Sequence, residues 1–450
     1  MTEKNKAVLV AVHLPDATDA EHLASLAELE RLVSTLGYQT VARISQKRDA
    51  LSSATVVGEG KLKELAAITG GTGHVGTTAP QKKDKARLKR EGAEVDDEDG
   101  DSDPEDGDSD ADSEIALVAV DHDLTPSQAR NLERAVGTSV LDRTGVIVEI
   151  FHRHAKSREA RLQVEIARLK YTAPRMRESP SGREKQQGRG AGEAALELDR
   201  RKIRDRIKEL EEELEVIAKD QDERRQHRKD ARRVALVGYT NAGKSSLMRA
   251  LTGSQVLVED KLFATLDTTV RALHPEVKPR ILVSDTVGFI KKLPHDLVAS
   301  FKSTLDEAKE ATLLLHVVDA SDPTFESQYA VTREVLAEIG ASDVPARLVL
   351  NKCDCITAEA REALERRYPD AFFCSARLPE DVARLRAHII GFFEDRYVDA
   401  EVLVPYDRQA VVARMHDEAK VVSQDYREDG VLVVLRGDAD TVARLRRGLE

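Results

Sequence analysis

One segment of the chain has the residue types and the spacing of a loop that binds phosphate groups: Gly238-Tyr239-Thr240-Asn241-Ala242-Gly243-Lys244-Ser245. It matches the pattern G-x-x-x-x-G-K-[ST] and lies between a strand-like run, Val234 to Val237, and a predicted helix, Ser246 to Leu251. The glycines let successive backbone N–H groups surround a phosphate, and the helix N-terminus adds positive potential. Lys244 would reach the β- and γ-phosphate oxygens, and the Ser245 hydroxyl would bind Mg²⁺. We therefore predict a nucleotide-phosphate site over Gly238 to Ser246.

A second motif, Asp285-Thr286-Val287-Gly288, follows the strand predicted at Ile281 to Ser284. A carboxylate at this place can hold Mg²⁺ through its water shell, and the glycine N–H can meet the γ-phosphate. The next residue is Phe289, where Ras-type switches offer a glutamine to orient the attacking water. An apolar ring cannot bind that water, so we expect slow hydrolysis without a partner or a cation such as K⁺.

The third motif, Asn351-Lys352-Cys353-Asp354, comes at the end of the strand predicted at Arg347 to Leu350 and indicates which base is bound. A carboxylate at Asp354 can accept hydrogen bonds from guanine N1–H and from the exocyclic amine of guanine. Adenine lacks an amine at that position, and its N1 is an acceptor instead of a donor. The Lys352 stem can cover the ring. After a last strand, Cys374-Ser375-Ala376 offers a backbone N–H for guanine O6. These motifs, in this order and each at a strand end, predict GTP rather than ATP as the nucleotide.

A switch segment is expected between the first two motifs, at Phe263-Ala264-Thr265-Leu266-Asp267-Thr268-Thr269. Such a segment needs one threonine to complete the coordination of Mg²⁺ and to sense the γ-phosphate. Spacing alone leaves Thr265, Thr268 and Thr269 open for this role.

The elements that must position these motifs form an α/β pattern in several parts. We predict an N-terminal open α/β domain at 1–150, with a disordered insertion at 70–114. An antiparallel helical hairpin follows at 151–232, with a flexible basic loop at 178–192. A Ras-like nucleotide-binding domain with a mostly parallel sheet is predicted at 233–397, and a small C-terminal α+β domain at 398–450.

Two finer expectations concern the helices. Apolar residues at helical spacing predict one helix over Arg153 to Met176 and a longer one over about Glu193 to Arg232. The longer helix carries a heptad seam at Ile203, Ile207, Leu210, Leu214 and Ile217. In the C-terminal part, Asp407 to Val422 and Asp438 to Leu449 are predicted helical, with strands at Glu401 to Val404 and Val431 to Leu435.

Composition excludes several classes of protein. The 450 residues are 41% apolar, 4% aromatic and 33% charged, without tryptophan, which is typical of soluble proteins with two to four domains and is unsuited to aromatic stacking of bases. The longest apolar runs are too short for a membrane span, and the start is too polar for a signal peptide, so we expect a cytoplasmic protein. Three cysteines, Cys353, Cys355 and Cys374, show no disulfide or zinc pattern and are expected to be reduced thiols.

The charge is unevenly distributed. The net charge is −12, yet Glu94 to Glu114 alone holds 13 carboxylates and no basic residue, so the rest of the chain sums to −12 + 13 = +1. Phe151 to Gly190 holds 11 Lys and Arg against 4 Asp and Glu, a local excess of +7. A basic segment of this kind favours a polyphosphate partner such as RNA.

Beyond the nucleotide motifs, four segments resemble the HflX family of the Obg–HflX superfamily of GTPases: Arg130 to Ala135, Val140 to Thr144, Ser157 to Glu165, and Glu197 to Ile203. Phe263 to Leu266 is similar to the superfamily's F-[AT]-T-L switch, which favours Thr265 as the Mg²⁺ ligand. The family pattern G-x-G-P-G-E-T-Q-L-E stands here as Gly188 to Glu197, with alanine in place of Pro, Thr and Gln at Ala191, Ala194 and Ala195. The acidic insertion is not part of the pattern.

This resemblance implies a GTPase that uses Mg²⁺, held by Ser245, Thr265 and Asp285, with Lys244, Thr265 and Gly288 in catalysis. It also implies association with the large ribosomal subunit and a role in ribosome splitting or rescue, with the hairpin approaching the peptidyl transferase region. We expect the protein to act as a monomer. The alternative is a GTP-dependent switch that recruits protein partners through its coiled coil, without RNA contact.

Overall fold

A computed structural model describes residues 5–75, 115–176, 191–226, 232–253, 262–263, 269–291 and 302–449. The acidic run at 94–114, Thr265 and residues 178–190 of the basic loop expected at 178–192 lie outside the described residues, and what was expected of them stays a prediction. The last two residues of that expected loop, Ala191 and Gly192, belong to the helix Ala191–Gln226. By its internal contacts the chain divides into two compact units, Met1–Val146 and Ile147–Glu450.

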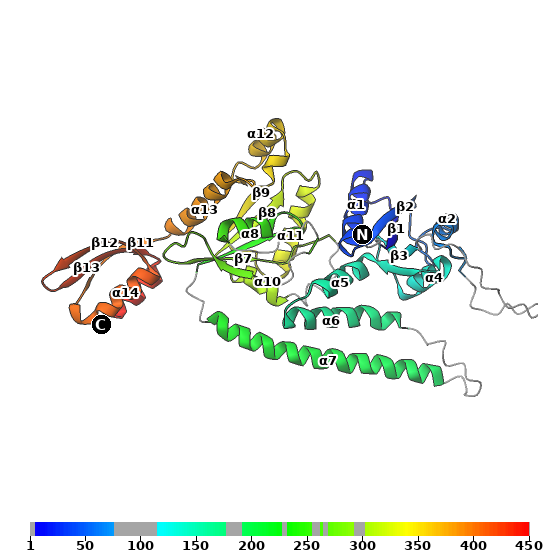
Figure 1. The fold of residues 1–450 in the computed structure, drawn as a ribbon, viewed down its shortest axis with the longest axis horizontal. Coiled ribbons are helices and arrows are strands. Elements are labelled where there is room, and N and C mark those ends of the chain that lie inside the picture. The colour runs from blue at the N-terminus through cyan, green and yellow to red at the C-terminus, as the bar shows by residue number, and fades with distance from the viewer. Residues whose placement is uncertain are drawn as a thin grey trace, which may run out of the picture. The chain divides into compact units, whose positions relative to one another are not determined.

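The first unit is built on a four-stranded parallel sheet with the order β2-β1-β3-β4 (Figure 1). This confirms the open α/β class. Its strands and helices are β1 (Lys6–His13), α1 (Asp19–Thr35), β2 (Gln39–Lys47), α2 (Glu59–Thr69), β3 (Ile115–Val120), α4 (Pro126–Val136) and β4 (Ser139–Asp142). The short strand β4 was not among the expected elements.

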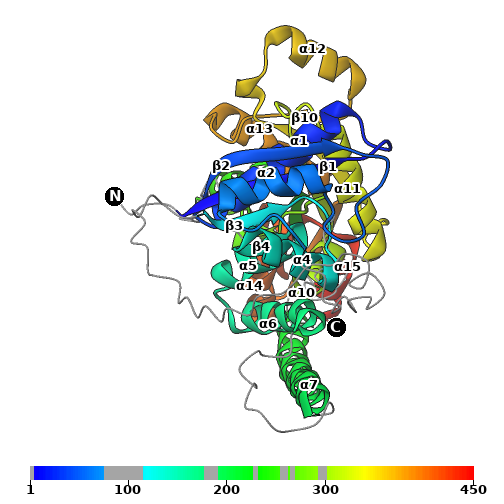
Figure 2. The ribbon, with the colours of Figure 1, turned by 90° about the vertical axis from the view of Figure 1, so that its right-hand side faces the viewer.

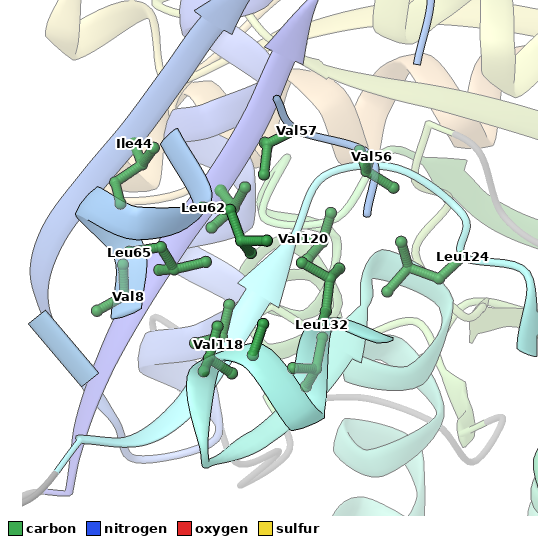
Figure 3. Close-up of a cluster of buried hydrophobic side chains, with 14 of the residues drawn as sticks. Val8, Ile44, Val56, Val57, Leu62, Leu65, Val118, Val120, Leu124 and Leu132 are labelled. Atoms are coloured by element: carbon green, nitrogen blue, oxygen red, sulfur yellow. The ribbon is translucent and has the colours of Figure 1, made fainter. Parts of the chain in front are cut away.

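One hydrophobic core of this unit lies between the sheet and helices α2 and α4. Figure 3 shows Val8, Val118 and Val120 of the sheet meeting Leu62 and Leu65 of α2 and Leu132 of α4, all buried. Local sequence fixes where the helices begin. Thr125 forms a capping box with Gln128, and Pro126 occupies the first turn of α4, where its missing N–H costs nothing.

A buried ionic cluster joins three elements of the same unit. Arg143 follows β4 and is almost fully buried. Its guanidinium binds the carboxylate of Glu28 on α1 and donates to Asp121 Oδ1 after β3 at 2.8 Å. Ser25 of α1 also donates to Asp121, at 2.5 Å. A buried charge is stable only when it is paired, so this cluster fixes how α1 packs against the sheet.

The helical hairpin consists of α6 (Arg158–Thr172) and α7 (Ala191–Gln226), preceded by α5 (Arg143–His154). The single helix expected over Arg153 to Met176 is therefore wrong at its start. The chain leaves helix α5 after His154, and Ser157 begins a new helix by accepting a hydrogen bond from the N–H of Ala160 at 3.1 Å. A 3₁₀ turn, Ala173–Arg175, ends α6.

Helices α6 and α7 lie side by side in both views (Figure 1 and Figure 2). Leu162 and Ile166 of α6 pack with Leu210, which is fully buried, and with further seam residues Ile207, Leu214 and Ile217. Ion pairs flank this seam: Arg158 with Glu213 at 3.1 Å, Arg206 with Glu165 at 3.2 Å, and Lys170 with Glu211 at 3.0 Å. The two helices run antiparallel, which confirms the helical hairpin predicted from the sequence.

The second unit contains a six-stranded sheet with the order β10-β9-β8-β5-β7-β6. All pairs are parallel except β6 with β7. The strands are β5 (Arg232–Gly238), β6 (Thr269–Ala272), β7 (Ile281–Asp285), β8 (Leu313–Asp319), β9 (Ala346–Asn351) and β10 (Phe372–Phe373). The helices are α8 (Lys244–Thr252), α10 (Lys302–Lys309), α11 (Phe325–Glu338), α12 (Ala358–Arg367) and α13 (Pro379–Glu394). The strand β6 was not expected.

The C-terminal part is a three-stranded antiparallel sheet, β11-β13-β12, with two helices. Its elements are β11 (Val398–Val404), α14 (Gln409–Glu418), β12 (Lys420–Arg427), β13 (Gly430–Gly437) and α15 (Ala439–Arg447). The helix expected to reach Val422 ends at Glu418, because Lys420 to Arg427 pair with β13 instead. Within the described ranges no helix combines the length and apolar character that crossing a membrane requires.

Candidate nucleotide-binding site

Most of the predicted site residues that the structure describes gather at one edge of the six-stranded sheet. Gly238 ends β5, Asp285 ends β7 and Asn351 ends β9, while Ser375 and Ala376 follow β10. Because parallel strands have their carboxyl ends at the same edge, the motifs that are far apart in sequence meet there. This edge is where open α/β sheets bind ligands.

The phosphate loop runs from the end of β5 into helix α8. Gly243 has a φ of +92°, and a Cβ atom there would lie 2.2 Å from the side-chain nitrogen of Asn351, so only glycine fits. The buried ammonium of Lys244 donates to the carbonyls of Gly238 at 3.0 Å and Tyr239 at 2.8 Å. Burial lowers the pKa of Lys244 to about 8, although the nearby Asp285 carboxylate raises it.

Asn351 joins the phosphate loop to the segments 352–354 and 374–376, which are called the base loop after the role predicted for them. Its side-chain N–H donates to the carbonyl of Ala242 at 2.9 Å, and its side-chain oxygen accepts from the N–H of Ala376 at 3.1 Å. The residue is buried between them. Its position indicates that Asn351 braces the two loops.

A hydroxyl and a carboxylate lie side by side where a metal ion was predicted. Ser245 Oγ donates to Asp285 Oδ2 at 2.6 Å. Both are hard oxygen groups of the kind that Mg²⁺ prefers, so this donor set fits the ion. Among the described residues no group of three or more His, Cys, Asp or Glu side chains could hold a metal ion.

The base loop carries Lys352 and Asp354. Lys352 adopts a left-handed backbone conformation with φ of 63° and pairs through its ammonium with Asp319 Oδ2 at 2.7 Å. A hydrogen bond from Ser375 lowers the pKa of the Asp354 carboxyl, with Arg377 adding to this effect. Asp354 is therefore an ionised acceptor at neutral pH. Ser375 is itself fixed, because its N–H donates to Asp381 Oδ2 at 2.9 Å.

The segment after Asp285 is bound to the phosphate loop through its backbone. The N–H of Thr240 donates to the carbonyl of Phe289 at 2.8 Å, and the N–H of Phe289 donates to the carbonyl of Gly238 at 3.1 Å. The Tyr239 hydroxyl accepts from the N–H of Lys291 at 2.7 Å. The sequence did not predict the role of the Tyr239 hydroxyl or the hydrogen bonds between the phosphate loop and residues 289–291. Tyr239 stands at a position of the loop motif that any residue can occupy, so the motif says nothing about its side chain.

Gly288 and Phe289 differ in what surrounds them. A Cβ atom at Gly288 would lie 2.9 Å from Thr240 and 3.1 Å from the Lys244 ammonium, so a side chain there would displace the phosphate loop. The Phe289 ring is buried. Its burial agrees with the expectation that this side chain does not orient a water molecule.

Thr286 and Phe263 have structural contacts. Thr286 is buried and donates its hydroxyl to the carbonyl of Leu236 at 2.8 Å. Phe263 has a φ of 58° and lies edge-on to Phe151 of α5, with ring centroids 4.5 Å apart. Ala264 and Thr265 lie outside the described residues, so the threonine expected to bind Mg²⁺ is not placed.

Three family profiles match the chain. Their descriptions are GTP-binding GTPase N-terminal, at residues 23–75 and 108–152, GTP-binding GTPase Middle Region, at 154–228, and 50S ribosome-binding GTPase, at 233–352. A protein named GTPase HflX from Gluconacetobacter diazotrophicus is 61% identical over 443 residues, covering 98% of this chain and 97% of that protein. The chain belongs to the HflX family of GTPases.

Other HflX proteins match over most of their length. The GTPase HflX of Escherichia coli is 35% identical over 433 residues, which cover 94% of this chain and 91% of that protein. That of Caldanaerobacter subterraneus is 36% identical over 454 residues. As a member of the HflX family, the protein binds and hydrolyses GTP.

Among solved structures, a GTP-binding protein from Sulfolobus solfataricus in complex with GDP is 23% identical to this HflX-family chain. The match covers 86% of this chain and 99% of that one, with a TM-score of 0.43.

Proposed function

We propose that this HflX-family GTPase associates with the large ribosomal subunit and uses its GTP cycle in ribosome splitting or rescue. The observation that carries the proposal is the match of residues 233–352 to the profile described as 50S ribosome-binding GTPase, joined to a long helical hairpin in the same chain. On this proposal the nucleotide site is the switch and the hairpin is the part that contacts RNA. The parts would be those expected from sequence, with boundaries near 150, 232 and 397.

The charge of the hairpin supports contact with RNA phosphates. Residues 151–190 hold 11 Lys and Arg against 4 Asp and Glu. Some of these cations already pair across the hairpin, as Arg158 and Lys170 do with glutamates of α7. Arg161 and Arg168 are exposed on α6, and the connecting segment adds Arg177, Arg183, Lys185 and Arg189. We infer that the end of the hairpin at this connection is its RNA-binding part.

Within the nucleotide site, we propose that the phosphate loop, Gly238 to Ser246, cradles the phosphates. Phe263, Ala264 and Thr265, with Asp285 to Gly288, would surround the γ-phosphate. Asn351, Lys352, Asp354, Ser375 and Ala376 would recognise guanine. Ser245, Thr265 and Asp285 would hold Mg²⁺, which when bound neutralises charge on the β- and γ-phosphate oxygens.

The catalytic groups would act mainly by position and charge. Lys244 would bind β- and γ-phosphate oxygens, and Thr265 and the N–H of Gly288 would contact the γ-phosphate side. Phe289 is buried and has no hydrogen-bonding group for the attacking water. We therefore propose that hydrolysis is slow in the protein alone and is accelerated by its partner.

A co-sedimentation experiment tests the ribosome proposal. The full chain is incubated with large subunits and either a non-hydrolysable GTP analogue or GDP, over a range of salt concentrations. More protein should pellet with the analogue. Binding should fall steeply with salt, with log K declining by roughly 0.7 to 0.9 per phosphate contact for each unit of log salt. Replacing Arg175, Arg177, Arg183, Lys185 and Arg189 by Ala should weaken binding and flatten the slope.

A matched control removes five exposed arginines elsewhere: Arg366, Arg367, Arg436, Arg446 and Arg447. This variant has the same charge change but should bind subunits as the parent does. Both variants should keep their GTP affinity. If binding to the large subunit changed neither with salt nor with the five hairpin substitutions, the proposed contact between the hairpin and RNA would be wrong.

The second candidate is a GTP-dependent switch that recruits a protein through the hairpin. Exposed apolar residues on α7 favour it, because Leu198 is 54% and Val216 is 61% exposed. Under this alternative, Leu198→Ser with Val216→Ser would abolish recruitment of the partner, and the loss would not depend on salt.

A further inference from the structure

Asp319 is the last residue of β8 and lies beside Asn351 of β9 in the sheet register. Both of its carboxylate oxygens are engaged. Oδ2 pairs with the Lys352 ammonium at 2.7 Å, while Oδ1 accepts from the N–H of Ser321 at 2.9 Å and from its hydroxyl at 2.6 Å. None of the three motifs includes Asp319. The Asp319 side chain is 15% exposed and that of Lys352 29%, so their pair is only partly screened by water.

The Lys352 side chain is fixed at both of its ends. At the backbone end, the residue is left-handed and its carbonyl accepts from the N–H of Cys355 at 2.9 Å, within the 3₁₀ turn Cys353–Cys355. At the other end, Asp319 holds the ammonium. Without a partner, a lysine side chain populates many rotamers. Binding that requires one of these rotamers is weakened by the loss of side-chain conformational entropy.

We propose that Asp319 is a positioning residue for the guanine nucleotide: it holds the Lys352 ammonium so that the aliphatic stem is already in place to cover the base. Asp319 does not touch the nucleotide. The inference rests on the proposed assignment of Lys352 and Asp354 to guanine. Ser321 supports it indirectly, because its two hydrogen bonds orient the Asp319 carboxylate.

A structural role is the alternative explanation for Asp319. Its bonds to Ser321 could stabilise only the turn between β8 and α11. Such a role would not depend on the ammonium of Lys352, whereas a positioning role must. The two explanations therefore differ in a double-mutant cycle that joins position 319 to position 352.

The experiment measures GDP affinity and GDP release of the full chain, with fluorescent GDP as the probe. Asp319→Asn keeps the shape of the side chain but removes its charge. We expect about 3- to 10-fold weaker binding, seen as faster release. Lys352→Met keeps most of the stem and removes the ammonium, and should cause a similar loss. Adding Asp319→Asn to Lys352→Met should change the affinity by less than about twofold.

Two further variants complete the test. Glu310→Gln breaks the Arg233 pair at the opposite end of β5 and should leave GDP affinity unchanged. Ser321→Ala keeps the pair with Lys352 and should cost less than Asp319→Asn. Ser321→Ala also tests the inference if Asp319→Asn does not fold. If Asp319 has a positioning role, Ser321→Ala should lower GDP affinity in the parent protein but not in the Lys352→Met variant.

The outcomes separate this inference from the site assignment. Equal losses from Asp319→Asn with and without the Lys352 ammonium would assign Asp319 a structural role and overturn the inference. The inference would also be overturned if Asp319→Asn left GDP affinity unchanged while Lys352→Ala weakened GDP binding. If Lys352→Ala leaves GDP affinity unchanged, the guanine assignment itself fails, and the inference fails with it.

Discussion

Lys244 carries its ammonium group inside the protein, where burial lowers its pKa from 10.5 to about 8. A lysine on the surface would stay charged at every physiological pH. Phosphate oxygens brought to this place would favour the protonated form and raise the pKa again. If Lys244 binds phosphate as proposed, nucleotide binding would be coupled to the uptake of a proton above pH 8.

We predict that GDP affinity is constant from about pH 6.5 to 7.5 and falls as the pH rises above 8. Below 8 the lysine is already protonated, whereas above 8 binding must first add a proton, so log K should decline by up to about one for each pH unit. Calorimetry in two buffers of different ionisation enthalpy would count the protons taken up. The range should stop near pH 9, because guanine N1–H loses its proton at higher pH.

In Lys244→Arg the guanidinium keeps its charge throughout this range, so the remaining affinity should not depend on pH. Proton release in place of uptake, or an unchanged pH profile in the arginine variant, would contradict the coupling.

Asp354 tests the choice of base. The hydrogen bond from Ser375 holds the pKa of this carboxyl below its usual value, so it accepts hydrogen bonds as an anion. Asp354→Asn should weaken GTP binding by on the order of 100-fold, because an amide cannot accept both guanine protons. The same variant should gain affinity for xanthosine triphosphate. Competition assays with the two nucleotides would measure both effects.

The exposed neighbour Cys355 offers a control, since Cys355→Ser should keep the preference for guanine. If Asp354→Asn bound GTP as tightly as the parent, guanine would not be read at this position.

At the scale of elements, the packing of α1 on the first sheet depends on the buried cluster around Arg143. Arg143→Met would leave the carboxylates of Glu28 and Asp121 buried without their cation, which costs about 3 to 5 kcal/mol of unfolding free energy. Hydrogen exchange of the β1 and β3 amides would report this loss locally. Arg43→Met breaks an exposed pair with Glu30 and should cost less than about 1 kcal/mol. Equal protection in the two variants would show that the cluster adds little.

The elements also show what the sequence could predict. Strands such as β5, β7 and β9 are mainly apolar runs next to recognisable motifs, so these strands were predictable. By contrast, β12 is largely polar and exposed, and its strand structure comes from pairing with β13. The break between α5 and α6 depends on one capping serine. The buried pairs of Arg143 were not predicted, because only the folded chain brings Glu28 and Asp121 to it.

In the candidate site, too, some features could be predicted from the sequence and others could not. The motifs predicted the phosphate loop, Ser245 and Asp285 as Mg²⁺ ligands, and the base-recognition residues, because each group stands at a fixed spacing. The structure places these segments at the same edge of the sheet, and their roles stay predictions. Asp319 and the Tyr239 hydroxyl could not be found, since they act through contacts between segments far apart in sequence or at variable positions. Thr265 still depends on the family resemblance.

For the whole molecule, the length of α7 has a mechanical consequence. The helix has 36 residues, Ala191–Gln226, which at a rise of about 1.5 Å each make a rod of about 54 Å. Its last residue precedes β5 by only a short connection, and β5 ends in the phosphate loop. A pivot of about 5° at that end would carry the opposite end through about 5 Å, because a rod converts a small angle into a displacement proportional to its length. A small change of angle near the proposed nucleotide site would therefore become a displacement of several ångströms at the far end of α7.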